Sequence, residues 1–129
     1  MQAFIILISY FNHMRKTHIS FEIELDGHNI PSRIQWTATD KPTDAPSETK
    51  SIHIALWDTS EKNTLSIFLW TREMPVYEMK RFYIDCLGSM AQGILQATGD
   101  SFFAGQTHEL CEKLVEQLRT EASRQDQEL

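Results

Sequence analysis

The period of the hydrophobic pattern changes once along the chain, and this change constrains the fold more than any other feature. Ile19–Leu25 alternates apolar and polar residues, which is typical of a strand with one face on a core and one in water. From Val76 to Leu118, apolar residues recur at helical spacing instead. This order, with the strands before the helices, predicts an α+β domain. In such a domain an antiparallel sheet of about four strands is followed by two helices that pack on one face of the sheet.

The strand segments are separated by residues typical of turns. The second strand places Ile34, Trp36 and Ala38 inward, after a turn at residues 26–29 whose residues tolerate positive φ. Residues 40–50 are rich in Pro, Thr, Asp and Ser, and they predict a solvent-exposed loop. The next two strands flank a polar turn and are predicted to pair as a hairpin; they are Ile52–Trp57 and Leu65–Trp70.

Both strands of this hairpin are apolar on both faces. In the first of them, Ile52, Ile54 and Leu56 oppose Ala55 and Trp57. Such a strand is either covered by helices on one side or lends its second face to another subunit. Helix cover is the favoured interpretation, because two helices follow in the sequence.

The helical half of the chain has clear start and stop signals. Pro75 suits the first turn of a helix, and Gly99 is a natural end for it. Asp100 and Ser101 then form a capping pair for a second helix. Inside the first helix, Gly88 and Gly93 predict either close approach of a neighbouring element or a kink. The polar tail at residues 121–129 is predicted to fray.

The sequence divides into a short extension, one domain and a tail. Residues 1–13 contain an apolar run that is too short to cross a bilayer as a helix. The extension is interpreted either as an extra strand or arm, or as sequence upstream of a true start at Met14, and the second interpretation is favoured. Residues 14–120 are then the single α+β domain.

Charge and cysteine usage exclude several classes of function. The chain has 12 Lys and Arg against 18 Asp and Glu, a net charge of −6, and no basic cluster, which argues against nucleic acid as a partner. Cys86 and Cys111 fall on apolar helical stripes and are interpreted as free thiols in a reducing compartment. The expected location is therefore the cytoplasm, with the periplasm as the alternative if residues 1–13 act as an export signal.

We find no pattern typical of a catalytic or metal site. The histidines lack zinc-ligand spacing, although His18, Ser20, Glu22 and Glu24 share one face of the first strand. A solvated polar face is favoured there over a metal or acid–base site, because a catalytic carboxylate needs burial to shift its pKa. We therefore expect no catalytic residue, no metal ligand and no cofactor.

The three tryptophans all fall on predicted strands. Trp36, Trp57 and Trp70 are interpreted as core-filling residues, with a ligand pocket or an interface as the alternatives. An interface gains support if Trp57 and Trp70 lie opposite each other on the less apolar face of the hairpin.

The junction between strands and helices carries a family resemblance. Asn63–Lys80 runs from a Leu-Trp strand end through Met74-Pro75 into a helix, which continues with Leu87–Ala91. In these features the chain resembles the gliding-motility-associated GldC family, over about Met14 to Arg119. The resemblance implies a small soluble protein of the gliding machinery, and the family has no established enzymatic activity and no catalytic residues to carry over.

The resemblance leads to two functional hypotheses. The first is an accessory protein of gliding motility that binds other proteins of that machinery, self-associates through the hairpin and performs no catalysis. Its expected interface residues are Trp57, Phe68, Trp70 and Met74. The alternative is a small-ligand carrier or chaperone-like module, with a groove between sheet and helices lined by methionines such as Met74, Met79 and Met90.

Overall fold

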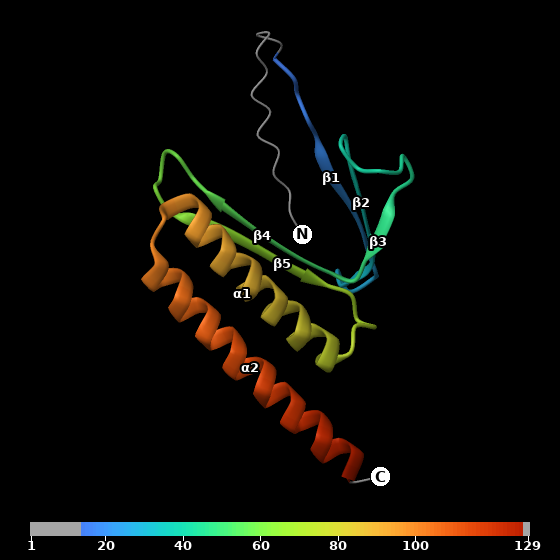
Figure 1. Ribbon diagram of the computed structural model, residues 1–129. Coiled ribbons are helices and arrows are strands. Elements are labelled where there is room, and N and C mark those ends of the chain that lie inside the picture. The colour runs from blue at the N-terminus through green and yellow to red at the C-terminus, as the bar shows by residue number, and fades with distance from the viewer. Residues whose placement is uncertain (1–13, 128–129) are drawn as a thin grey trace. The chain divides into compact units, whose positions relative to one another are not determined.

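The computed structural model describes residues 14–127, and the chain divides into two compact units. The first unit, up to Met74, contains five strands, and the second, from Pro75, contains two helices. This order confirms the predicted α+β class of antiparallel strands followed by helices (Figure 1). The predicted packing of both helices on one sheet face stays a prediction, and the extension at residues 1–13 lies outside the described residues.

The first sheet is antiparallel and has three strands in the order β1-β2-β3. They are β1 (Ile19–Leu25), β2 (Pro31–Ala38) and the short β3 (Ser47–Thr49). Phe21 pairs with Trp36 and Ile23 pairs with Ile34, so the alternating apolar residues of β1 and β2 share one face as predicted. Ile34 anchors this face, with only 1% of its surface exposed.

The turn between β1 and β2 depends on Asp26. Its Oδ1 accepts hydrogen bonds from the backbone N–H groups of His28 at 2.7 Å and Ile30 at 3.1 Å. Asn29 takes the left-handed conformation with φ 60° that the reversal requires. Pro31 is the first residue of β2, where its missing N–H removes no essential ladder bond.

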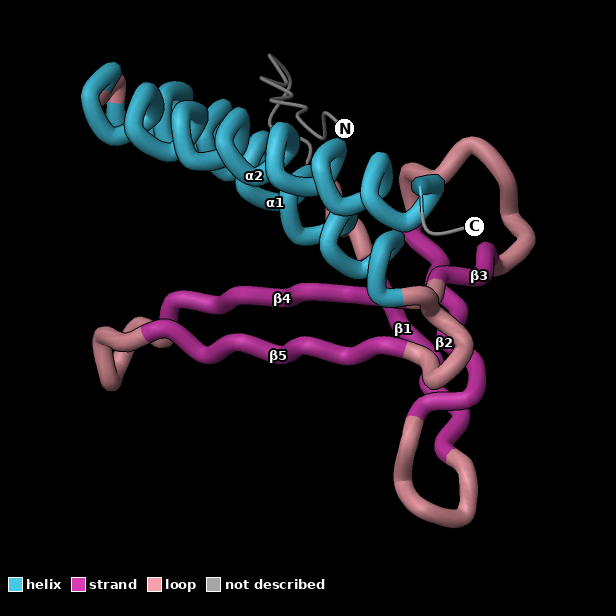
Figure 2. The backbone as a smooth tube through the Cα atoms, turned by 90° about the horizontal axis from the view of Figure 1, so that it is seen from below, coloured by secondary structure: helices cyan, strands magenta, loops and turns pink. Residues whose placement is uncertain are grey.

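The second sheet is the hairpin of β4 (Ser51–Trp57) and β5 (Thr64–Trp70) (Figure 2). Two details correct the sequence prediction. The expected loop at residues 40–50 contains β3, and the strands form two sheets rather than one sheet of four. Lys50 alone separates β3 from β4, so the chain passes from one sheet into the other within a single residue.

The helical unit is an antiparallel hairpin of α1 (Val76–Thr98) and α2 (Ser101–Gln127) (Figures 1 and 2). Pro75 caps the start of α1, and Gly99 ends it in the left-handed conformation with φ 69°. The Oδ1 of Asp100 accepts hydrogen bonds from Phe102 and Phe103 at 3.0 Å, as its predicted capping role requires. α2 continues to Gln127, so residues 121–127 belong to the helix, and the fraying predicted for residues 121–129 stays a prediction.

Gly88 lies where the two helices approach each other. A Cβ atom at this position would sit 3.7 Å from the Sγ of Cys111, which in turn lies 3.4 Å from the carbonyl oxygen of Ile84. The predicted close approach is therefore confirmed at Gly88. At Gly93, by contrast, an added Cβ atom would meet nothing within 4 Å, so α2 makes no close approach there.

Candidate interaction surface

The register of the β4–β5 hairpin separates its side chains into two faces of different chemistry. Three aliphatic pairs line one face: Ile52 with Leu69, Ile54 with Ile67, and Leu56 with Leu65. Four pairs line the other face, and three of them contain aromatic residues: Ser51 with Trp70, His53 with Phe68, Ala55 with Ser66, and Trp57 with Thr64. Because side chains alternate along a strand, no residue belongs to both faces. We call the second one the aromatic face.

The aromatic face presents large side chains with substantial exposure. Trp57 is 66% exposed, Trp70 46% and Phe68 45%. The imidazole of His53 stacks on the Phe68 ring, with 4.1 Å between ring centroids and an interplanar angle of 13°. This stacking orients the two side chains at the centre of the aromatic face, because aromatic rings that lie nearly parallel restrict each other's rotation.

Trp57 and Trp70 lie on the same face but at opposite ends of the hairpin. Each pairs across the ladder with a small polar residue, Thr64 and Ser51 respectively. The condition that they lie directly opposite each other is therefore not met, although both belong to the less apolar face. Core filling, the favoured interpretation of the tryptophans, is wrong for these two, because both are exposed.

Trp36 does not join this surface, because it belongs to β2 in the first sheet. There the Nζ of Lys41 lies 4.8 Å from its ring centroid, within the range of a cation–π contact. Trp36 is only partly exposed. Its half-buried position fits the structural role that was expected of it.

Met74 lies beyond the strands, in the segment between β5 and α1. Its N–H donates a hydrogen bond to the carbonyl oxygen of Thr71 at 3.2 Å, and its side chain is half-buried. The hairpin therefore groups three of the four expected interface residues on one surface, whereas Met74 follows the surface in sequence. Its contribution to binding stays a prediction.

Neither strand of the hairpin carries a charged side chain. Ser51–Trp57 and Thr64–Trp70 contain no Asp, Glu, Lys, Arg or Pro. Within the described residues, β4 and β5 pair only with each other, so each has one edge without a strand partner. Charges, Pro and bulges are the usual means by which proteins prevent pairing at such edges, and the two strands contain neither a charged Asp, Glu, Lys or Arg side chain nor Pro. This chemistry permits an extended segment of a partner to pair with the sheet.

An ion pair that the sequence did not indicate joins the two sheets of the first unit. The guanidinium of Arg72, just after β5, lies 3.0 Å from the Oδ2 of Asp26 in the β1–β2 turn. The hydrogen bonds from Ile30 and His28, followed by the charge of Arg72, lower the pKa of Asp26 below its usual 3.8. Sequence periodicity carries no signal for a pair so distant along the chain.

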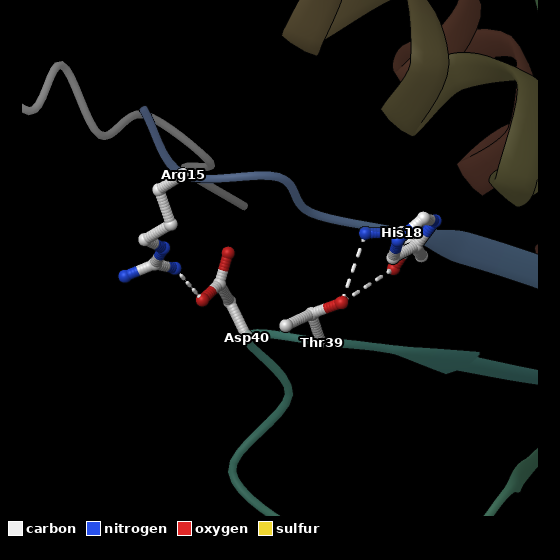
Figure 3. A network of polar contacts seen from close by, with 4 residues as sticks. All are labelled: Arg15, His18, Thr39 and Asp40. Carbon is white, nitrogen blue, oxygen red and sulfur yellow. Dashed lines mark hydrogen bonds and ion pairs between the residues drawn. The ribbon is translucent and has the colours of Figure 1, made fainter. Parts of the chain in front are cut away.

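The polar groups near the start of β1 serve to hold the strand ends together (Figure 3). The His18 N–H donates to the Oγ1 of Thr39 at 2.9 Å, and the Thr39 N–H donates to the carbonyl oxygen of His18. Arg15 pairs with the carboxylate of Asp40 beside them. Among residues 14–127, no group of three or more His, Cys, Asp or Glu side chains is placed to hold a metal ion.

A groove runs between the two helices of the second unit. It has a volume of about 260 Å³. Its lining is mainly apolar and comprises Lys80, Tyr83, Ile84, Leu87, Leu114, Gln117, Leu118 and Glu121. At one end the Nζ of Lys80 lies 2.9 Å from the Oε2 of Glu121, and this contact, followed by the amide of Gln117, lowers the pKa of Glu121. Met74, Met79 and Met90 do not line this groove.

The two cysteines are free and half-buried, as the sequence predicted. Burial, followed by the negative charge of Asp85, raises the pKa of the Cys86 thiol. A raised pKa lowers the fraction of thiolate, which is the reactive form. Within the part of the chain that the structure describes, no helix is long and apolar enough to span a membrane.

Fold and surface together define a small α+β protein, in which two antiparallel sheets precede a helical hairpin and one sheet exposes an aromatic face. The family model described as gliding motility-associated protein GldC-like matches residues 31–120, more than half of the chain. The chain therefore belongs to the GldC-like family, which confirms the resemblance seen at the strand–helix junction. The match begins at β2 and leaves β1 outside it. No curated protein and no solved structure gives a significant match.

Proposed function

We propose that this member of the GldC-like family is a gliding-motility accessory protein that binds other proteins of the gliding machinery through the β4–β5 hairpin and performs no catalysis. One observation carries the proposal: Trp57, Phe68 and Trp70 are exposed together on one face of a hairpin whose two strands contain no Asp, Glu, Lys or Arg. Aromatic residues of this kind dominate the binding energy of protein interfaces. A face rich in them costs solubility unless a partner covers it.

The strand edges suggest how a partner would bind. An extended segment added to β4 or β5 would form main-chain hydrogen bonds along the edge, and its alternate side chains would contact the aromatic face. Main-chain bonding supplies affinity, whereas Trp57 and Trp70 at the two ends of the face supply specificity. The preferred partner is thus a protein with an exposed, extended apolar segment.

The location we propose for this activity is the cytoplasm. Two free thiols are typical of a reducing compartment, where structural disulfides are rare. Fractionation of cells with an antibody against the protein measures the location directly. Recovery with the periplasmic fraction would contradict it.

The test uses purified full-length protein and extracts of gliding cells. A tagged wild type is used to recover partners, which are identified by mass spectrometry and then purified for direct binding measurements. Phe68→Ser and Trp70→Ser should each weaken binding at least about tenfold, because exposed aromatic anchors often contribute more than ~1.4 kcal/mol. Circular dichroism should show an unchanged fold, since both side chains are substantially exposed.

Phe102→Ser is the matched control. It makes the same chemical change on an exposed ring at the start of α2, outside the hairpin. Binding that survives Phe68→Ser and Trp70→Ser, or that falls equally in Phe102→Ser, would contradict a role for the aromatic face. Gliding assays of cells carrying the same variants extend the test to motility.

A further inference from the structure

A second apolar surface lies on the helical hairpin, where two stripes of side chains flank the groove. On α1, Tyr83 and Leu87 line the groove, and Met90 and Ile94 continue their stripe at helical spacing. On α2, Leu114 lines it, and Leu110 and Phe103 continue that stripe. We call the surface formed by the groove and these two stripes the groove face.

The groove face is more exposed than a core surface would be. Phe103 is 62% exposed, while Met90 and Leu110 are each 47% exposed. Residues outside the groove lining are buried or closely approached between the helices, among them Gly88 beside Cys111 and the buried Ala91 and Ala104. Within the helical unit, neither helix covers the groove face, so a further apolar surface can pack against it.

The charge of the groove face favours a copy of itself as the partner. Lys80 and Glu121 are the charged groups that line the groove, and they neutralise each other across a distance of 2.9 Å. The whole chain has a net charge of −6, so most of its surface would repel a second copy. A neutral apolar face avoids this repulsion, and it offers no excess charge to select a basic or acidic partner.

The size of the groove face also suits a dimer. The groove face extends over residues 80–94 of α1 and 103–121 of α2, which is roughly 21–27 Å of helix, and two adjacent helices are roughly 20 Å wide. Their common face therefore covers about 500 Å² on each copy, or about 1,000 Å² in total, which is the size of a weak, concentration-dependent dimer interface. By contrast, a groove of about 260 Å³ is smaller than most small-molecule sites.

We propose that the groove face binds the groove face of a second copy of this chain, which forms a four-helix bundle around a two-fold axis. In such an isologous contact, Leu110 and Leu114 of each copy pack against Tyr83 and Leu87 of the other or against their own counterparts. The ion pair of Lys80 and Glu121 then lies toward the rim. The proposal does not depend on the β4–β5 hairpin, so the two surfaces can be tested separately.

The experiment measures the molar mass of the full-length protein over a wide concentration range by sedimentation equilibrium. The wild type should pass from monomer to dimer as its concentration rises. Leu110→Lys and Leu114→Lys should each raise the dimer dissociation constant at least about tenfold, because each places a charge at the centre of an apolar interface. Circular dichroism at low concentration establishes that the variant helices remain folded.

Ser123→Lys is the matched control, because it adds the same charge on the opposite side of α2. Positions 114 and 123 are nine residues apart, which is about 180° around a helix. A dimer that weakens with both leucine variants and persists in Ser123→Lys supports the proposal.

Four results would overturn it. The wild type could remain a monomer at every concentration, or a dimer could persist in both leucine variants. A dimer that is lost in Trp70→Ser but not in Leu114→Lys would assign self-association to the hairpin instead. Native mass spectrometry of a monomer carrying a bound apolar molecule would assign the groove to a ligand.

Discussion

Strands β1 and β5 have the same length but opposite surface chemistry. Each has seven residues, and each has one edge without a strand partner among the described residues. β1 places Glu22 and Glu24 on the face opposite its apolar residues, and its pairing with β2 shifts register between Glu24 and Leu25. β5 has no charge on either face and a regular register. Charge and irregularity protect an edge from unwanted pairing, so only the β5 hairpin is suited to accept a partner.

The largest expected effect concerns burial in the two sheets. Ile34→Ala should lower the free energy of unfolding by about 2–5 kcal/mol, because Ile34 is 1% exposed and its truncation leaves a cavity. Ile67→Ala in β5 should cost less than half as much, since that side chain is substantially exposed. Urea unfolding followed by circular dichroism measures both. Equal losses of unfolding free energy would show that the side chains of the hairpin are as well buried as those of the first sheet.

A smaller effect concerns the ion pair that joins the two sheets. The pKa of Asp26 is lower in the folded protein than its usual 3.8, so its carboxylate stabilises the fold fully above that pH. The stabilisation is lost as the pH falls through the lower, folded-state pKa. The difference in unfolding free energy between wild type and Asp26→Asn should therefore be largest near neutral pH and shrink in acid.

Arg72→Gln separates the causes of this pKa shift. The backbone N–H groups of Ile30 and His28 contribute more to it than Arg72 does. The variant should therefore retain most of the pH dependence, as measured by urea unfolding at a series of pH values. Complete loss of the pH dependence would mean that the ion pair between the sheets, rather than the hydrogen bonds of the turn, sets the pKa of Asp26.

The smallest change in stability should come from adding a charge to β5 and removing one from β1. Ser66→Lys adds a charge to the aromatic face, and Glu22→Val removes one from β1, both at exposed positions. Each should change the free energy of unfolding by less than about 0.5 kcal/mol. Light scattering should show reduced association for Ser66→Lys and increased association for Glu22→Val. The opposite order would contradict the protective role of charge in β1.

The sequence predicted the elements better than their assembly. Alternation in β1 and the Pro75 and Gly99 signals identified strands and helices, because these patterns arise from local geometry. The short β3 was missed, since its Ser-Glu-Thr sequence has no apolar alternation and it forms only by pairing with β2. The division of the strands into two sheets was missed for the same reason. It depends on which strands pair with each other, and the hydrophobic period of a single strand does not encode its pairing partner.

The candidate surfaces were predicted to different degrees. Two apolar faces on each hairpin strand were visible in the alternation of Ile52–Trp57, which is why Trp57 and Trp70 were expected at an interface. The exposure of those tryptophans was not visible, because an aromatic residue on a strand more often fills a core. The groove face escaped prediction because it requires the pairing of α1 with α2, although the stripe of Phe103, Leu110 and Leu114 was its signal.

Lys50, the single residue between β3 and β4, fixes how the hairpin is oriented. The chain bends at this residue, so the direction in which β4 leaves the first sheet depends on the backbone of one residue. An insertion or deletion of one residue at this point should therefore change the directions in which the aromatic and aliphatic faces of the hairpin point. The length of this connection, more than its composition, therefore determines which chemistry the hairpin presents to a partner.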